Sequence, residues 1–296
     1  MNNPEKILYC IPLRYMIIIA DSGSTKTSWA LIMNNERHYA EGPGMHPGHI
    51  DIGRIHQYIP DEVVEWHNSS TQCTMKFFGS GCLHDSMSQM MKHALLGVLP
   101  HARIEVHSDL AGAAYATLGA RPGLIAILGT GSSAARWSGH SLIAVSPSLG
   151  YILGDEGSGA DLGKELLAQV FHHILPQSLI DHFHLFETRS RHEILREIYQ
   201  SAHPGKELAR YVAFLQQCMH DPAIEDLIMR RFDLFFDRQI MPLYQTHDQV
   251  CIAGGVAGAF SEMLVQEATN RDVDILKILP SPIHGLIDYF GAEENV

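Results

Sequence analysis

Two copies of one short pattern constrain the fold more than any other feature of this sequence. An apolar strand, a turn of glycine and hydroxyl residues and a second strand occur in MIIIADSGSTKTSWALIM (16–33) and again in LIAILGTGSSAARW (124–137). Because the same unit recurs roughly a hundred residues later along the chain, the sequence predicts two similar halves that face each other.

The stretches around both copies predict an α/β protein, because short apolar strands alternate there with helical segments. Residues 16–118 are expected to form an N-terminal domain and residues 119–283 a C-terminal domain. Helix-period runs between Ala160 and about Leu243 predict helical insertions in the second domain. We expect residues 1–15 to be a poorly ordered leader, and a C-terminal helix, about 284–296, to pack back on the first domain.

The charge balance excludes several kinds of partner. The chain has 33 acidic residues against 21 lysines and arginines, a net charge of -12. This argues against a nucleic-acid groove or an anionic membrane face as the working surface. The sequence shows no export signal or transmembrane span, and its five cysteines have no disulfide or zinc spacing. A cytoplasmic protein is therefore expected, in which a bound polyanion is held by backbone N–H groups and hydroxyls.

The first turn, DSGSTKT, is predicted to bind phosphate. Asp21 follows the strand and can hold a hydrated Mg²⁺, while Gly23 permits the positive φ of a tight turn. The N–H groups of the turn can then converge on phosphate oxygens, together with the hydroxyls of Ser24, Thr25 and Thr27. The alternative is a plain hairpin turn.

The second turn, LGTGSS, repeats this arrangement with Gly129, Thr130, Gly131 and Ser132. It is neither a Walker loop nor GxGxxG, since no GKS or GKT follows the glycines. Together the two turns predict a clamp for a nucleotide triphosphate. A third junction, IAGGVAG, places Gly254 and Gly255 where adenine can lie against backbone, although close strand-to-helix packing explains these glycines equally well.

Two acidic positions are candidates for chemistry. Asp109 opens a helix of small residues after a strand and is either an N-cap or a general base that accepts the proton of an attacking hydroxyl. In SLGYILGDEGSGAD (148–161), four glycines surround Asp155 and Glu156. A carboxylate in such a loop can accept hydrogen bonds from neighbouring sugar hydroxyls, and the alternative is a pair of acids that favours a helix N-terminus.

Taken in order, DSGSTKT, SDLAGAA, LGTGSS, LGDEGSG and IAGGVAG resemble the N-acetylglucosamine kinase branch of the BadF/BadG/BcrA/BcrD ATPase family. This family belongs to the actin, sugar kinase and heat-shock chaperone superfamily, and the resemblance covers the chain from Met16 to its end. It implies two ribonuclease H-like domains with an interdomain site for ATP and a sugar. The implied activity is phosphorylation of the 6-hydroxyl of N-acetylglucosamine or a closely related amino sugar.

The resemblance also implies roles for single residues. Asp109 would activate the sugar hydroxyl, Asp21 would hold Mg²⁺ through water, and Gly254 and Gly255 would lie against adenosine. His46 stands where related kinases often carry an asparagine, and Leu149 where an aromatic residue can occur. The full set of implied sugar contacts is His46, Ser80, Asp109, Thr130, Ser148, Leu149, Gly150 and Asp155.

Two other functions stay open at this stage. One is an ATPase activator that passes electrons to a dehydratase through an iron–sulfur cluster, which one or two cysteines per chain could hold across a dimer. The other is a sugar or nucleotide sensor without catalysis. The expected partners are an amino sugar and ATP, and the sequence leaves a homodimer open.

Overall fold

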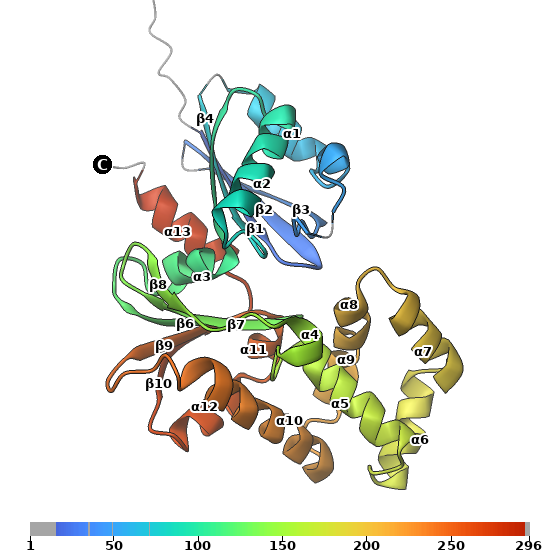
Figure 1. The fold of residues 1–296 in the computed structure, drawn as a ribbon. Helices are drawn as coiled ribbons and strands as arrows, with labels where there is room; N and C mark the ends of the chain where they lie inside the picture. The colour runs from blue at the N-terminus through green and yellow to red at the C-terminus, as the bar shows by residue number, and fades with distance from the viewer. Residues whose placement is uncertain (1–15, 35, 49, 71, 294–296) are drawn as a thin grey trace, which may run out of the picture.

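The computed structural model describes residues 16–293 apart from Asn35, His49 and Thr71. The predicted leader, residues 1–15, lies outside the described residues. Two five-stranded sheets, with strand orders β3-β2-β1-β4-β5 and β10-β9-β6-β7-β8, lie one above the other in Figure 1. Each sheet has helices of its own, so the molecule is built as two α/β halves.

The first sheet consists of an antiparallel meander extended by two parallel strands. Strands β1, β2 and β3 form the meander, and β4 and β5 follow in parallel beside β1. The strands span β1 (Met16–Ser22), β2 (Lys26–Met33), β3 (Glu36–Pro43), β4 (Cys73–Gly79) and β5 (Ala102–Ser108). The Ile17–Ile19 run forms a central strand because its β-branched side chains pack on both faces of the sheet.

The second sheet repeats this topology. Strands β6, β7 and β8 form the meander, and β9 and β10 follow in parallel beside β6. The strands span β6 (Gly123–Leu128), β7 (Ser132–Trp137), β8 (Leu142–Val145), β9 (Gln249–Ala253) and β10 (Asp274–Leu279). The prediction of an α/β fold with two ribonuclease H-like halves is confirmed.

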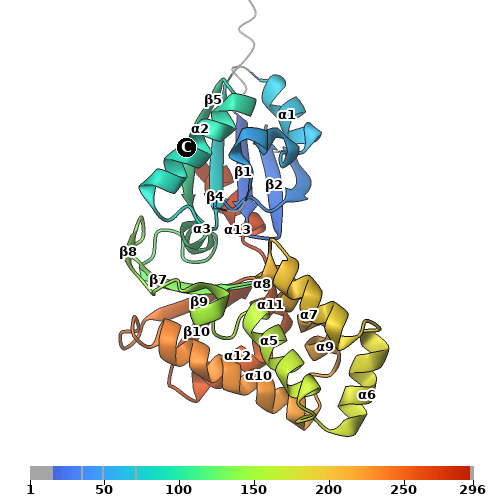
Figure 2. The same ribbon diagram turned by 45° about the vertical axis from the view of Figure 1, so that its right-hand side comes forward.

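Helices surround both sheets and fill the long insertion before β9 (Figure 2). In the first half they are the 3₁₀-helix η1 (Ile52–Gln57), α1 (Asp61–Asn68), α2 (Asp85–Val98) and α3 (Asp109–Thr117). In the second half they are α4 (Gly150–Leu153), α5 (Gly159–Phe171), α6 (Gln177–Phe186), α7 (Arg191–Gln200), α8 (Pro204–Ala209), α9 (Val212–Gln217), α10 (Pro222–Phe235), the π-helix η2 (Phe236–Ile240), α11 (Gly255–Ala259), α12 (Ser261–Thr269) and α13 (Ile283–Glu293).

Two helices, α3 and α13, connect the two halves. Helix α13 follows the last strand of the second sheet but packs on β1 and β2 of the first, where Leu286 and Ile287 are buried against Ile17 and Ile19. Helix α3 follows the last strand of the first sheet and packs both on β1, β4 and β5 of that sheet and on β6, β7 and β9 of the second. The two helices also pack against each other between the sheets, so the halves share their cores (Figure 1).

None of the helices in the described residues is both long and apolar enough to span a membrane.

Candidate functional site

The predicted site residues of the first half lie at one edge of its sheet. Ser22 of β1 pairs with Gly79 of β4, and Gly79 pairs with Ser108 of β5. Because these strands are parallel, the segments that follow them emerge together at their carboxyl ends, the edge at which open α/β sheets bind ligands. The register therefore brings Asp109 and the Ser80 turn to the same edge as the first turn, DSGSTKT.

The first turn is a tight loop, in which Gly23 does not adopt the positive φ that the sequence predicted. Gly23 N donates to Lys26 O at 3.0 Å, and Gly44 after β3 packs so closely that a Cβ on it would lie 2.5 Å from Gly23 O. The residues from Gly23 to Lys26 are exposed. The main-chain groups and the hydroxyls of Ser24 and Thr25 are thus placed where a ligand could reach them.

The predicted role of Thr27 needs a correction. Its side chain is buried, and its hydroxyl lies 2.8 Å from Ser22 Oγ and donates to Pro43 O at 2.8 Å. Ser22 Oγ in turn accepts from Met45 N at 2.9 Å. The Thr27 hydroxyl therefore ties the first turn to the segment after β3 and does not point to a phosphate.

The second turn is held by the start of α5. Gly129 N donates to Gly131 O at 3.0 Å, and the carbonyls of Gly129 and Thr130 accept from Gly159 N at 2.8 Å and Ala160 N at 3.1 Å. These bonds fix the backbone of the turn without using its side chains. Ser132 Oγ is buried and finds no hydrogen-bond partner among the described residues. Such an unpaired hydroxyl is a group that a bound polar ligand could satisfy.

The glycine junction after β9 combines both of the expected explanations. Gly254 has φ 128°, and a Cβ on it would lie 2.4 Å from Leu128 O, so close packing against the second turn requires glycine there. Gly255 is exposed, and a Cβ on it would meet no described atom within 4 Å. Gly254 is therefore explained by packing, whereas Gly255 leaves room for a flat ring.

A hydrogen bond joins the two turns across the halves of the molecule. Thr25 Oγ1 lies 3.2 Å from Thr130 Oγ1, although the two residues are 105 positions apart in the chain. The repeated motifs thus meet at one place. This is the arrangement that the sequence predicts for a clamp made from two turns.

Two carboxyl groups at the edge of the first sheet have raised pKa values. Burial raises the pKa of Asp21 to about 7, with a further contribution from the negative charge of Asp109 and an opposing one from Lys26. Burial raises the pKa of Asp109 to about 6, against the hydrogen bond that Leu110 N donates to its Oδ1 at 2.9 Å. Paired acids with shifted pKa values are typical of catalytic and cation-binding sites.

Asp109 is not the N-cap of α3. Ser108 has the extended backbone of an N-cap, and its Oγ accepts from Ala111 N at 3.2 Å. Asp109 is the first helical residue, and the N-cap role that the sequence left open for it is taken by Ser108. Of the small residues after it, Ala111, Ala113 and Ala114 are buried against the second sheet, whereas Gly112 lies against Phe78 of the first.

Asp155 lies beside the second turn. Its Oδ1 accepts from Ser132 N at 3.4 Å, and a Cβ on Gly131 would lie 3.0 Å from its Oδ2. Burial raises the pKa of Asp155, against the Ser132 N–H and with help from the charges of Glu156 and Asp161. The N-cap of α5 is Ser158, whose Oγ accepts from Asp161 N at 3.2 Å, so Asp155 is not needed to cap this helix.

Comparison with known proteins decides the family. No protein-family model matches the chain, and no curated protein matches it. Among solved structures, a protein from Porphyromonas gingivalis that is provisionally assigned as an N-acetylglucosamine kinase has 30% identical residues and a TM-score of 0.88, over 94% of this chain and 99% of that one. The chain belongs to the N-acetylglucosamine kinase-like branch of the BadF/BadG/BcrA/BcrD ATPase family.

Two further structures share the fold of this N-acetylglucosamine kinase-like protein. One, from Chromobacterium violaceum and with the same provisional assignment, has 18% identity and a TM-score of 0.75 over 94% of this chain and 99% of that one. The other, a glucokinase of the ROK family from Streptomyces griseus in complex with glucose and AMPPNP, has 12% identity and a TM-score of 0.50, over 96% of this chain and 100% of that one. At these identities only the fold is shared.

The residues that the family resemblance assigns to the sugar fall into two places in this N-acetylglucosamine kinase-like chain. In the first half, His46 accepts from Gly48 N at its Nδ1 (3.1 Å), and its ring packs on Gly81. Ser80 is beside them, with a buried hydroxyl that has no partner among the described residues. His46 follows β3, whereas the sequence placed it after the second strand, since it predicted no strand at 36–43.

In the second half, the expected sugar contacts Ser148, Leu149 and Gly150 precede Asp155 in the N-acetylglucosamine kinase-like chain. Ser148 is exposed, Leu149 is 55% exposed, and Gly150 has φ 69° with no described atom near its Cβ position. An apolar side chain that is half exposed at such a place is available to a ligand. These residues directly precede the Asp155 loop, at the start of α4.

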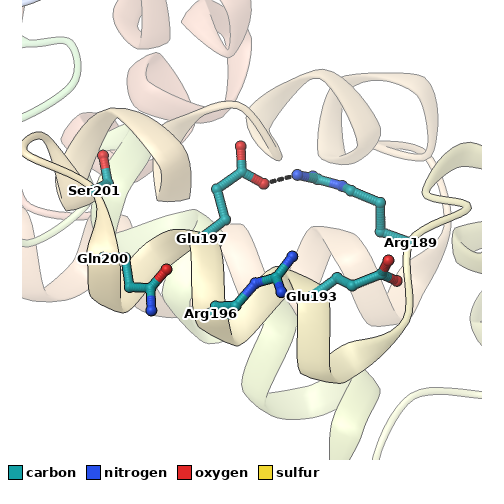
Figure 3. Close-up of a pocket in the computed structure, with 6 residues that line it drawn as sticks. All are labelled: Arg189, Glu193, Arg196, Glu197, Gln200 and Ser201. Carbon is teal, nitrogen blue, oxygen red and sulfur yellow. Dashed lines mark ion pairs between the residues drawn. The ribbon is translucent and has the colours of Figure 1, made fainter.

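Sequence reasoning missed Gly44 and Ser22, which hold the first turn. It also missed Arg231 and Arg238, which hold the Asp155 loop through Asp161 and Glu156. The GPG triplet around Pro43 could have drawn attention to Gly44, because Gly-Pro and Pro-Gly pairs mark turns. The hollow on α7 in Figure 3 is unrelated to the site of this N-acetylglucosamine kinase-like protein. It is lined by charged and polar residues around an Arg189–Glu197 ion pair: Arg189, Glu193, Arg196, Glu197, Gln200 and Ser201.

Proposed function

We propose that this protein is an ATP-dependent kinase that phosphorylates the 6-hydroxyl of N-acetylglucosamine or a closely related amino sugar. The solved structure with 30% identity is provisionally assigned to this activity. The observation that carries the proposal is the contact between the two turns. Thr25 and Thr130 meet at the edge that also carries Asp109. We propose that hydrogen-bond donors for phosphate, from both halves, and a carboxyl base act together there.

Each group has a role in this reaction. Asp109 orients the sugar hydroxyl and accepts its proton while the hydroxyl oxygen bonds to the γ-phosphorus and the bond from that phosphorus to ADP breaks. With a pKa of about 6, Asp109 is mostly ionised at neutral pH. Because this pKa is close to neutral pH, Asp109 can also take up a proton during the reaction. The N–H groups of the turns, with the hydroxyls of Ser24, Thr25 and Thr130, donate to the phosphate oxygens.

The residues present fit the ligands that this reaction requires. Ser132 Oγ and Ser80 Oγ are buried without partners among the described residues, and Gly255 leaves open space beside the second turn. A nearby cation would lower the raised pKa of Asp21, and we propose that Asp21 would hold a Mg²⁺ through water. When bound, Mg²⁺ neutralises charge on the phosphates. His46, Ser80 and Asp155, with the Ser148–Gly150 segment, are proposed to contact the sugar.

A coupled assay of ADP release tests the proposal. The purified protein is given MgATP with N-acetylglucosamine, glucosamine, N-acetylmuramic acid, N-acetylmannosamine or glucose in turn. We expect the highest kcat/KM with N-acetylglucosamine and a phosphorylated 6-position in the product. Absence of ADP release with every sugar would reject the kinase, and ATP binding without any product would favour a sensor.

The alternative of an iron–sulfur ATPase activator is weakened by the cysteines. The four that the structure describes, Cys73, Cys82, Cys218 and Cys251, are all buried, and burial raises the pKa of Cys73 and of Cys82 to about 12. A cluster shared across a dimer needs thiolates at the surface. Cys10 lies outside the described residues. An anaerobic absorption spectrum with iron–sulfur bands would restore this alternative.

A further inference from the structure

The loop that carries Asp155 adopts a backbone conformation that needs external support. Asp155 has φ 57°, a region that L-residues other than glycine rarely occupy, and Gly157 two positions later has φ 73°. Within the loop, Ser158 N donates to Asp155 O at 3.0 Å. A strained position of this kind persists only where the surrounding structure fixes it.

Glu156, the residue after Asp155, is anchored to the end of the α10–η2 helix. Its side chain is 5% exposed, and its Oε1 accepts from Arg238 Nη1 at 2.7 Å while its Oε2 accepts from Gln239 Nε2 at 3.2 Å. Burial acts to raise the pKa of Glu156, but the hydrogen bonds from Arg238, from the Glu156 backbone and from Gln239, together with the charge of Arg238, outweigh it and the pKa is lowered. Glu156 is therefore held as a buried carboxylate.

The π-helix explains how two consecutive residues reach one carboxylate. In an α-helix neighbouring side chains point about 100° apart. At η2 the hydrogen bonding widens to i→i+5, with Met241 N donating to Phe236 O at 2.8 Å. Turns of this kind are frequent at functional sites, and here the turn presents Arg238 and Gln239 to Glu156.

The same helix holds the loop at a second point. Arg231 binds both oxygens of Asp161 at 2.7 and 2.8 Å, and Asp161 Oδ2 accepts from Gly157 N at 3.0 Å. A Cβ on Gly157 would lie 3.0 Å from Phe235 Cβ. The α10–η2 helix thus braces the loop at Glu156 and at Gly157, while the Asp155 side chain turns the other way, toward Ser132 and Gly131.

We propose that Glu156, held by Arg238 and Gln239, is a positioning residue that fixes the Asp155 carboxylate against the second turn for binding of the sugar. Glu156 itself does not touch the substrate; it acts through the backbone of its neighbour. The inference rests on the proposed function, in which Asp155 binds sugar hydroxyls. It adds that the helical insertion sets the affinity for the sugar and leaves the affinity for ATP unchanged.

The variant Arg238→Met tests this role against a closely matched control. Arg238 and Arg230 are on the same helical segment, with side chains 57% and 62% exposed, and each binds one carboxylate at 2.7 or 2.8 Å. Only the partner differs, since Glu156 is buried and Asp226 is exposed. In Arg238→Met we expect the KM for the sugar to rise at least tenfold and the KM for ATP to change less than twofold. Arg230→Met should leave both unchanged, because an exposed pair contributes little.

Two more measurements separate positioning from a purely structural role. Arg238→Lys, which keeps the charge, should recover most of the sugar affinity. Amide hydrogen exchange over residues 154–158 should accelerate in Arg238→Met and stay unchanged in Arg230→Met. A lower melting temperature in Arg238→Met with an unchanged KM for the sugar, measured well below that temperature, overturns the proposal.

The outcome remains decisive if the proposed function fails. A wild-type protein without sugar-dependent ADP release rejects the kinase, but hydrogen exchange still reports whether Arg238 anchors the loop. Unchanged exchange in Arg238→Met overturns the anchoring in either case. If the wild-type protein is active and Arg238→Met matches it, the positioning role alone is rejected.

Discussion

The substitution Asp109→Asn tests the proposed chemistry most directly. Asparagine has the size of aspartate and keeps an oxygen that can accept from Leu110 N, so α3 retains its first turn. It cannot take a proton from the sugar hydroxyl. Because a positioned general base contributes about 10²- to 10⁴-fold, we expect kcat to fall by at least about a hundredfold while sugar binding changes little.

The pH profile supplies a second magnitude. With a pKa of about 6, Asp109 is roughly nine-tenths ionised at pH 7 and about one-tenth at pH 5. Asp21, with a pKa of about 7, loses its charge over an overlapping range. The kcat/KM of the wild-type protein should therefore fall at least about tenfold between pH 7 and pH 5. Asp109→Asn removes the negative charge that contributes to the raised pKa of Asp21. The fall of kcat/KM that protonation of Asp21 causes should therefore occur at a lower pH in this variant.

The assay is steady-state ADP release from pH 5 to 8, with sugar binding followed by calorimetry. Asp61→Asn is the matched control, since Asp61 is also the first residue of a helix but is exposed in α1. It should keep wild-type kinetics. If Asp109→Asn retains more than a tenth of the wild-type kcat, Asp109 is not the base.

Three further predictions concern the turns and the stability of the first half. In Gly44→Ala the new Cβ would lie 2.5 Å from Gly23 O, so we expect a higher KM for ATP and a lower melting temperature. Gly97→Ala, in α2 with no described atom near the Cβ position, should instead stabilise the protein, by up to about 1 kcal/mol in chemical unfolding. Burial, helped by His101, lowers the pKa of His67, so the unfolded chain binds this proton more readily and the free energy of unfolding should fall as the pH drops below 6.5. His67→Gln should flatten this pH dependence and the exposed His93→Gln should not; equal slopes in all three proteins would contradict the assignment.

The sequence predicts the centres of both sheets because their strands are apolar and short. The runs that contain Ile17–Ile19 and Leu124–Leu128 could be recognised directly, and the repeated turn linked them. Strand β3 could not be recognised, since most of its residues are exposed and it is held by its backbone ladder with β2. Strand β10 is also at a sheet edge, where its side chains are only partly covered. Edge strands depend on pairing that a local hydrophobic pattern does not record.

The candidate site shows the same division. The turns and acids were predictable because glycine, hydroxyl and carboxyl groups after a strand have few local explanations. The difference between Thr27, which is buried, and Thr25, which is exposed, was not predictable. Both are threonines in one turn, and only the segment after β3 determines which hydroxyl is buried. Likewise nothing near Glu156 in sequence indicates Arg238, which lies 82 residues away.

The packing of α13 on the first sheet has a consequence for synthesis on the ribosome. The first sheet is complete once β5 has been made, yet Ile17, Ile19 and Ile32 on one of its faces are covered by α13, which is made last. An apolar face of the first sheet therefore stays exposed on the nascent chain while the second half is translated. A fragment that ends in the segment between α3 and β6 would keep that face permanently exposed and is expected to aggregate, so the whole chain, and neither half alone, is the unit that folds.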